Sequence, residues 1–149
     1  MGKAARAIII EDGNLLLMLR NKEGMQYYTL VGGQAKQDED LKMALAREVK
    51  EETGLEITSA RLVFTEKHAS PYNEQYIYLC TVAPHSEAAI QETSEEGLLN
   101  KIGINTHAPV WAHPRAFAGV QFRTPQLHQA ILDALQNGFP GSPVELTSR

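Results

Sequence analysis

The 149-residue chain contains a single cysteine, Cys80, and this scarcity excludes an intrachain disulfide. Small secreted domains commonly depend on several disulfides, whereas intracellular proteins keep their thiols reduced. Cys80 lies in a strand-like apolar segment, so we expect a buried, reduced thiol rather than a nucleophile. The expected compartment is the cytoplasm.

Long hydrophobic runs and an excess of basic residues are also missing. The apolar N-terminal stretch covers only residues 7–10 before Glu11 and Asp12, which is too short for a secretion signal or a membrane span. Lysine and arginine number 14 against 18 acidic residues, so the net charge is −4 and no basic patch stands out. We therefore expect neither a membrane nor a nucleic acid duplex as partner.

The five histidines lack the spacing of a zinc site. No two of them are four residues apart, and no cysteine pair accompanies them. The hydrophobic fraction of 43% is that of a globular protein, and the length suits one domain. We expect residues 1–149 to form that single domain.

Strand-like segments are interspersed with two helices. The predicted strands cover residues 4–10, 14–20, 27–31, 55–66, 75–83 and 109–112, and the acidic run from His85 to Glu96 is predicted to be a loop. The C-terminal helix has Thr124 as N-cap, Pro125 in its first turn and Gly138 as its end. This order predicts an α/β fold with a mixed sheet between helical layers.

The other helix, bounded by Asp38 as predicted N-cap and Gly54 as its end, carries three carboxylates at helical spacing. Glu48, Glu51 and Glu52 stand at positions i, i+3 and i+4, so their side chains converge on one face. We expect Glu39 and Asp40 in the first turn, where acidic residues complement the helix dipole. One interpretation of such a face is a solvated, glutamate-rich surface.

The direction of these carboxylates favours a metal site instead. At about 100° per residue, Leu41 and Leu45 point close to the direction of the glutamates, so the acids continue the apolar stripe. Acids on a packing face are costly unless they are paired or bind a cation, and carboxylate oxygens suit Mg²⁺ or Mn²⁺. Arg47, beside Glu48, is predicted to orient one carboxylate; its alternative role is that of a surface cation.

A glycine pair precedes this helix. Gly32 and Gly33 follow the predicted strand 27–31, where two glycines allow a sharp turn and a close approach to a ligand. Glycine pairs also occur in ordinary hairpins, so this feature is weak by itself.

These features together resemble a known family. Gly33, five residues, Glu39, seven residues and then the run Arg47–Leu55 resemble the signature of the Nudix hydrolases, over 23 of the 149 residues. Val31, Lys36 and Asp38 depart from residues that are common around the signature. They leave the glutamates intact and leave the substrate subgroup open.

The resemblance implies a Nudix-like α/β/α sandwich with a mixed central sheet and a loop–helix–loop metal site. It implies Mg²⁺ or Mn²⁺ bound by Glu48, Glu51 and Glu52, with Arg47 beside them, and hydrolysis of a nucleoside diphosphate linked to another moiety by water attack on a phosphorus. The general base in relatives is a glutamate of the motif or one from a later loop, which makes Glu95 and Glu96 outside candidates. Relatives often form homodimers.

The substrate contacts are less defined by the sequence. Arg20 is a candidate phosphate ligand or an ordinary strand-end arginine, and Gly32 and Gly33 are candidates for close contact with substrate. Tyr28 is a candidate for stacking on a base, although strand tyrosines more often pack within the sheet.

Two classes of function stay open. The first is a metal-dependent pyrophosphohydrolase, which the complete glutamate set favours. The second is a Nudix-like module that binds or senses a nucleotide without cleaving it. Within the first class, ADP-ribose-like sugar nucleotides, dinucleoside polyphosphates and damaged nucleoside triphosphates are all compatible with the sequence.

Overall fold

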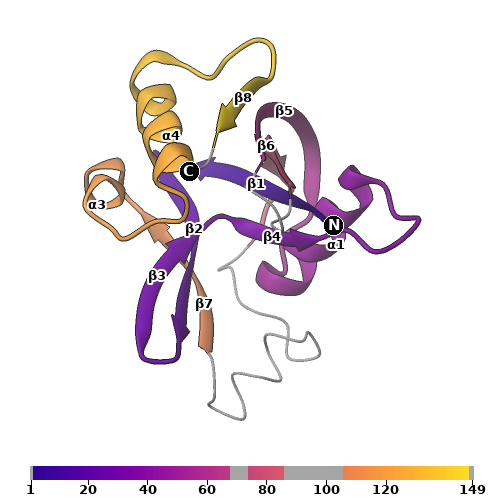
Figure 1. The fold of residues 1–149 in the computed structure, drawn as a ribbon, viewed down its shortest axis with the longest axis horizontal. Helices are drawn as coiled ribbons and strands as arrows, with labels where there is room; N and C mark the ends of the chain where they lie inside the picture. The colour runs from indigo at the N-terminus through magenta and orange to yellow at the C-terminus, as the bar shows by residue number, and fades with distance from the viewer. Residues whose placement is uncertain (1, 68–73, 86–105, 148–149) are drawn as a thin grey trace.

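The computed structural model of the chain describes residues 2–67, 74–85 and 106–147 (Figure 1). Strands make up most of this structure, and they are β1 (Lys3–Glu11), β2 (Asn14–Lys22), β3 (Met25–Thr29), β4 (Val31–Gln34), β5 (Ile57–Lys67), β6 (Glu74–Val82), β7 (Thr106–Ala112) and β8 (Val144–Thr147). The helices are α1 (Leu41–Thr53), α3 (Pro114–Ala118) and α4 (Pro125–Asn137).

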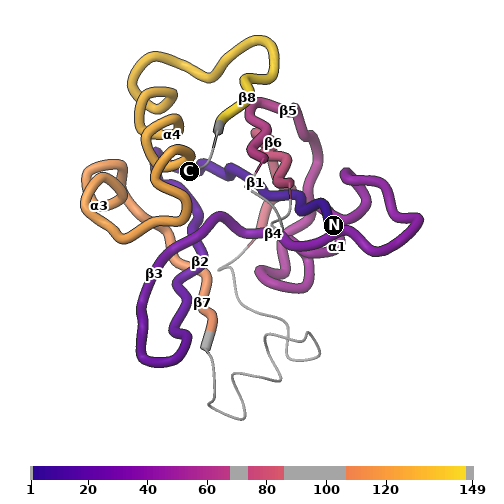
Figure 2. The backbone as a smooth tube through the Cα atoms, in the orientation of Figure 1, coloured from indigo at the N-terminus to yellow at the C-terminus, as the bar shows by residue number. Residues whose placement is uncertain are grey.

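The strands form one mixed sheet in the order β3-β2-β1-β6-β5-β8, to which β4 is added on β1 and β7 on β2. β1 runs parallel to β6 and β5 parallel to β8, whereas the other pairs are antiparallel. Figure 2 shows β7 beside β2, although the two are far apart in sequence, because Leu17 pairs with Val110.

The two faces of the sheet bury different cores. Side chains alternate along a strand, so Ala5, Ala7 and Ile9 of β1 pack on the side of α1, whereas Ile8 packs with α4. Each helix therefore covers one face, as Figure 1 shows. The predicted α/β/α sandwich with a mixed sheet is confirmed.

The predicted ends of α4 are also confirmed. Thr124 Oγ1 accepts a hydrogen bond from Leu127 N, Pro125 occupies the first turn, and Gly138 N donates to Ala134 O at the C-terminal end. Leu127 and Ile131 supply the buried face of the helix.

The start of α1 differs from the prediction. Asp40, not Asp38, is the N-cap, and its Oδ1 accepts a hydrogen bond from Met43 N at 2.8 Å. Asp38 has a φ of 68°, a left-handed conformation that precedes the helix, and the first turn itself holds no acidic residue. The prediction was wrong because Asp38 and Asp40 are equally good caps in sequence, and only the chain path decides between them.

The glycine pair lies in a strand rather than in a turn. Gly32 and Gly33 belong to β4 and pair with Arg6 and Ala5 of β1. A Cβ on Gly32 would lie 2.1 Å from Ala5 O, and its φ of 135° is one that L-residues rarely adopt. Gly32 therefore permits the close approach of β4 to β1. A glycine pair in the sequence is equally compatible with a turn and with such an approach.

Three elements were not predicted from sequence, namely β4, α3 and β8. Each of them is four or five residues long, which is too short for a clear periodic pattern.

Cys80 is 5% exposed, so its predicted burial is confirmed. No helix among the described residues is both long and apolar enough to cross a membrane.

Candidate functional site

Glu52 is the most buried carboxylate of the predicted set. Its side chain is fully buried, and its Oε1 accepts a hydrogen bond from Gly32 N at 2.6 Å. Its Oε2 lies 3.5 Å from Arg20 Nη2. Residue 52 thus joins the end of α1 to β4 and β2, and the predicted inward direction of this glutamate is confirmed.

Arg47 holds the carboxylate of Glu48 in place. Its Nη1 donates to Glu48 Oε1 at 2.9 Å and lies 3.5 Å from Glu51 Oε1, while Nε and Nη2 both donate to Glu39. The pKa of Glu39 is lowered to about 2, chiefly by its hydrogen bonds from Arg47. The pKa of Arg47 is raised, chiefly because its guanidinium donates hydrogen bonds to Glu39. Arg47 is therefore an orienting cation.

The backbone of Gly33 lies directly against Glu48. A Cβ added to Gly33 would lie 2.5 Å from Glu48 Cδ and Oε2. The carboxylate occupies the space that a side chain would fill, so this position needs glycine for packing rather than for a left-handed backbone.

A cavity of about 450 Å³ opens beside these groups. Its lining residues come from five strands, two helices, the link between β3 and β4 and the segment before α4. They are Arg6, Arg20, Tyr27, Thr29, Leu30, Gly32, Gly33, Gln34, Glu48, Gln75, Arg123, Thr124 and Leu127. Three of them are arginines and one is a carboxylate, in a chain whose net charge is −4. The cavity therefore favours an anionic ligand.

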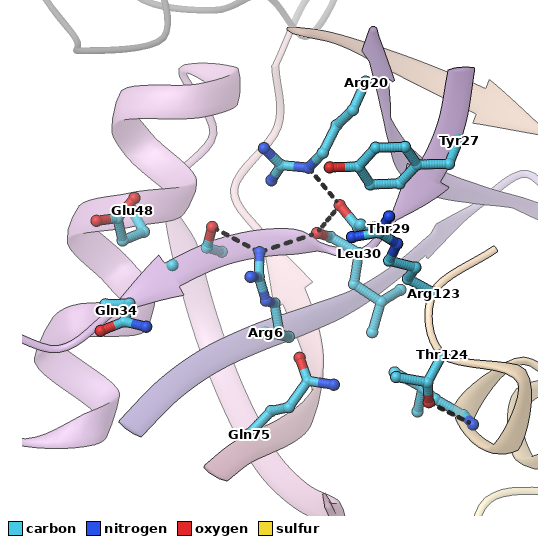
Figure 3. A pocket seen from close by; sticks show the side chains of 13 residues that line it. Arg6, Arg20, Tyr27, Thr29, Leu30, Gln34, Glu48, Gln75, Arg123 and Thr124 are labelled. Carbon is cyan, nitrogen blue, oxygen red and sulfur yellow. Dashed lines mark hydrogen bonds between the residues drawn. The ribbon is translucent and has the colours of Figure 1, made fainter. Parts of the chain in front are cut away.

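The three arginines are each positioned by protein groups. Arg6 Nη1 donates to Gly32 O at 3.0 Å, and Arg20 Nε donates to Thr29 Oγ1 at 2.8 Å. The guanidinium of Arg123 lies over the ring of Tyr27, 4.2 Å from its centroid. In Figure 3, Glu48 and Gln34 lie on one side of Arg6, and Arg123 and Thr124 lie on the other.

The carboxylates have the donor chemistry of a site for a hard divalent cation. Glu48 lines the cavity, Glu52 contacts its wall at Gly32, and Gly33 leaves room for Glu48 beside it. Across residues 2–67, 74–85 and 106–147, no three His, Cys, Asp or Glu side chains are grouped as ready metal ligands. The physical reason is that Arg47 lies between Glu48 and Glu51, while Glu52 is turned toward Gly32. The donor set fits the cation, and the metal site stays a prediction.

The structure brings most of the predicted site residues together. Arg20, Gly32, Gly33 and Glu48 line the cavity, and Glu52 lies next to them. Tyr28 does not line it, because strand alternation turns Tyr28 into the core beside α4 and gives the cavity Tyr27 instead. Glu95 and Glu96 lie outside the described residues.

Sequence reasoning missed Arg6, Arg123 and Gln75. A signal was present for Arg6, which is a charged residue at an inward position of an apolar strand, on the same side as Ile8. No comparable signal marks Arg123, which enters the cavity from the segment before α4.

Comparison with known proteins agrees with this architecture. The NUDIX domain model matches residues 1–102. No curated protein sequence matches the chain.

Several solved structures share the fold. A NUDIX hydrolase from Nitrosomonas europaea superposes with a TM-score of 0.71 at 14% identity, covering 99% of this chain and 79% of that one. The ORF135 protein from E. coli gives 0.67 at 24% identity, covering 95% of both chains. An ADP-ribose pyrophosphatase from Streptococcus suis gives 0.61 at 19% identity, covering 99% and 98%.

The family model covers more than half of the chain, and the described residues have the fold of Nudix hydrolases. The family generally uses divalent metal ions and small nucleotide substrates. The chain therefore belongs to the NUDIX domain family and is a hydrolase of the Nudix type, which acts on phosphoanhydride bonds.

Proposed function

We propose that the chain is a metal-dependent pyrophosphohydrolase that cleaves a nucleoside diphosphate linked to another moiety. The observation that carries this proposal is the cavity that has a carboxylate at one end and three arginines along its wall. Such a lining has separate places for a cation and for phosphate oxygens, which are the two charged components of this reaction.

Glu48, Glu51 and Glu52 are the residues that would hold Mg²⁺ or Mn²⁺. When bound, such a cation supplies positive charge that screens the phosphate oxygens from an attacking water. Arg47 keeps Glu48 oriented through the 2.9 Å hydrogen bond from its Nη1. Gly33 keeps the strand beside Glu48 free of a side chain, so that phosphate and carboxylate can come close together.

Arg6 and Arg20 are the residues that would bind the diphosphate. A guanidinium donates several hydrogen bonds in a fixed plane, which matches the oxygens of a phosphate. The bonds from Arg6 to Gly32 O and from Arg20 to Thr29 Oγ1 fix these side chains before substrate arrives. Binding then costs less side-chain entropy than it would with mobile arginines.

The same proposal includes the cytoplasm as compartment, residues 1–149 as one domain and a homodimer as assembly. The single, buried cysteine supports a reducing compartment. The family resemblance supports the other two expectations.

The test is hydrolysis of a nucleotide panel with and without Mg²⁺ or Mn²⁺. The panel contains ADP-ribose, a dinucleoside polyphosphate and nucleoside triphosphates. Wild type is expected to release a monophosphate or diphosphate product only with the metal, and Glu52→Gln is expected to lower the rate at least about tenfold. Glu56→Gln is the matched control, because Glu56 is 69% exposed and pairs with Lys50 outside the cavity.

Two results would contradict the proposal. One is equal activity of wild type and Glu52→Gln. The other is binding of nucleotides with no hydrolysis of any of them, which would favour the binding or sensor module.

A further inference from the structure

Glu66 is a fully buried carboxylate that the proposed reaction does not use. It lies on β5, two residues after Phe64, and its side chain reaches the end of the core that packs under α4. Burying a carboxylate is costly unless hydrogen bonds compensate it. The hydrogen-bond partners of Glu66 therefore indicate its role.

Both oxygens of Glu66 accept hydrogen bonds from residues of the cavity wall. Gln75 Nε2 donates to Oε1 at 2.6 Å, and Thr124 Oγ1 donates to Oε2 at 2.5 Å. Gln75 and Thr124 both line the cavity, whereas Glu66 lies behind them. A buried carboxylate thus connects two side chains that a ligand can touch.

These two bonds fix which atoms a ligand meets. A carboxylate can only accept, so it holds the amide nitrogen of Gln75 toward itself and leaves the amide oxygen for another donor. Figure 3 shows that oxygen turned toward Arg6 and the nitrogen turned to the side of Thr124. No residue in the described part of the chain donates a hydrogen bond to Gln75 Oε1.

A guanidinium and an aromatic ring are stacked in the same cavity. Arg123 is next to Thr124 in sequence, and its guanidinium lies 4.2 Å from the centroid of the Tyr27 ring. A planar guanidinium held over an aromatic ring offers a surface on which a nucleobase can stack. This pair lies away from Glu48, on the other side of Arg6.

We infer that Gln75 and Thr124, oriented by Glu66, form the base-recognising end of the cavity and select a nucleobase with an exocyclic amino group. The inference rests on the proposed function, because it assumes a nucleotide with its phosphates near Arg6 and Arg20. Gln75 Oε1 accepts from the amino group, and Gln75 and Thr124 are the residues that determine specificity. Glu66 is a positioning residue.

Adenine and hypoxanthine are the sharpest pair to compare. An amide complements adenine by accepting from its amino group and donating to the neighbouring ring nitrogen. Hypoxanthine has a carbonyl oxygen in place of the amino group, so it places an acceptor against Gln75 Oε1. A freely rotating amide would turn over and bind both bases, whereas Glu66 prevents this rotation.

The experiment measures the affinities of AMP and IMP by calorimetry without metal. Wild type is expected to bind AMP on the order of tenfold more tightly than IMP. Glu66→Gln replaces an acceptor by an amide that can accept as well as donate, so Gln75 can rotate. The AMP preference over IMP is then expected to fall from about tenfold to between about one- and threefold. Gln75→Leu removes the acceptor and is expected to abolish the preference also, which keeps the test decisive if Glu66→Gln does not fold.

A purely structural role of Glu66 predicts a different result. Thermal unfolding of each variant is recorded beside the affinities, and loss of stability with an unchanged AMP to IMP ratio would overturn the inference. Gln26→Leu, at an exposed position of β3, is the matched control and is expected to keep the wild-type ratio. Equal affinity of wild type for AMP and IMP, tighter binding of IMP or no binding of either would also overturn it. Failure of hydrolysis with every metal and nucleotide would instead overturn the proposed function, because the affinities are measured without metal.

Discussion

Gly33 matters because of the carboxylate that occupies the place of its side chain. The nearest atoms to an added Cβ belong to the far end of Glu48, at 2.5 Å, and that flexible side chain can move without disturbing the backbone. A larger residue at position 33 should therefore preserve the fold and displace the carboxylate.

Gly33→Ala is expected to lower the hydrolysis rate by on the order of 10- to 100-fold while the midpoint of thermal unfolding changes little. The physical reason is that a displaced carboxylate no longer meets its cation. The measurement pairs steady-state kinetics with a thermal melt. Gly119→Ala is the control, because its Cβ would lie 3.9 Å from Ala116 O, an ordinary contact. Full activity of Gly33→Ala would show that the position of Glu48 is unimportant.

The Arg47–Glu39 pair predicts a pH dependence of stability. The pKa of Glu39 falls from 4.5 to about 2 on folding, so the ionised carboxylate stabilises the folded state above pH 4.5, and this contribution is lost as the pH falls toward about 2. Urea unfolding of wild type should show the free energy of unfolding decreasing through this window. Arg47→Met should show a shallower decrease, and identical slopes for the two proteins would contradict the pairing.

At the residue scale, spacing in the sequence carried information on where side chains lie, such as the burial of Glu52 and the contact of Arg47 with Glu48, whereas their roles stay predictions. The positions of Glu48, Glu52 and Arg47 follow from helical geometry, and Arg20, a candidate from its strand end, lines the cavity. Gln75 and Arg123 could not be predicted, because the cavity wall depends on which strands pair and on where the segment before α4 passes. Local sequence determines neither the strand pairing nor the path of this segment.

At the scale of elements, the entry to α1 shows the limit of cap signals. Asp38 and Asp40 both stand before an apolar run, and the structure selects Asp40 because Asp38 adopts a φ of 68°. The long strands and α4 were predicted within a few residues, since their periodic patterns extend over many positions. Elements of four or five residues, such as β4 and β8, have no such pattern.

The corrected cap gives a prediction for stability. Asp40→Ala removes the hydrogen bond that Met43 N donates, so the free energy of unfolding should fall by about 1 kcal/mol. Asp38→Gly places glycine at a left-handed residue and should stay within about 0.5 kcal/mol of wild type. Urea denaturation compares the two variants. A greater loss of unfolding free energy for the variant at position 38 would favour Asp38 as the N-cap.

At the scale of the whole molecule, one sheet separates two apolar cores, with α1 on one side and α4 on the other. The cavity lies where these layers meet, because Glu48 of α1 and Leu127 of α4 both line it. The sandwich was predictable from the order of elements and from the family resemblance. The position of the cavity between the layers was not.

Cys80 reports on the integrity of the α1 core. Burial raises the pKa of its thiol to about 12, so the folded protein should hold the thiol protonated and shielded at neutral pH. Reaction with an aromatic disulfide reagent should be slow in buffer and complete within the mixing time in urea. Fast reaction of the folded protein would mean that this core opens readily.

The proposed reaction depends most on the carboxylates of α1 binding a divalent cation. A titration with Mn²⁺ followed by electron paramagnetic resonance tests this binding directly. Wild type and Glu145→Gln, which changes an exposed residue of β8, should bind with the same affinity. Glu48→Gln and Glu52→Gln should each bind at least about tenfold more weakly. Equal affinity of all four proteins, or no binding by wild type, would contradict a metal site at these carboxylates.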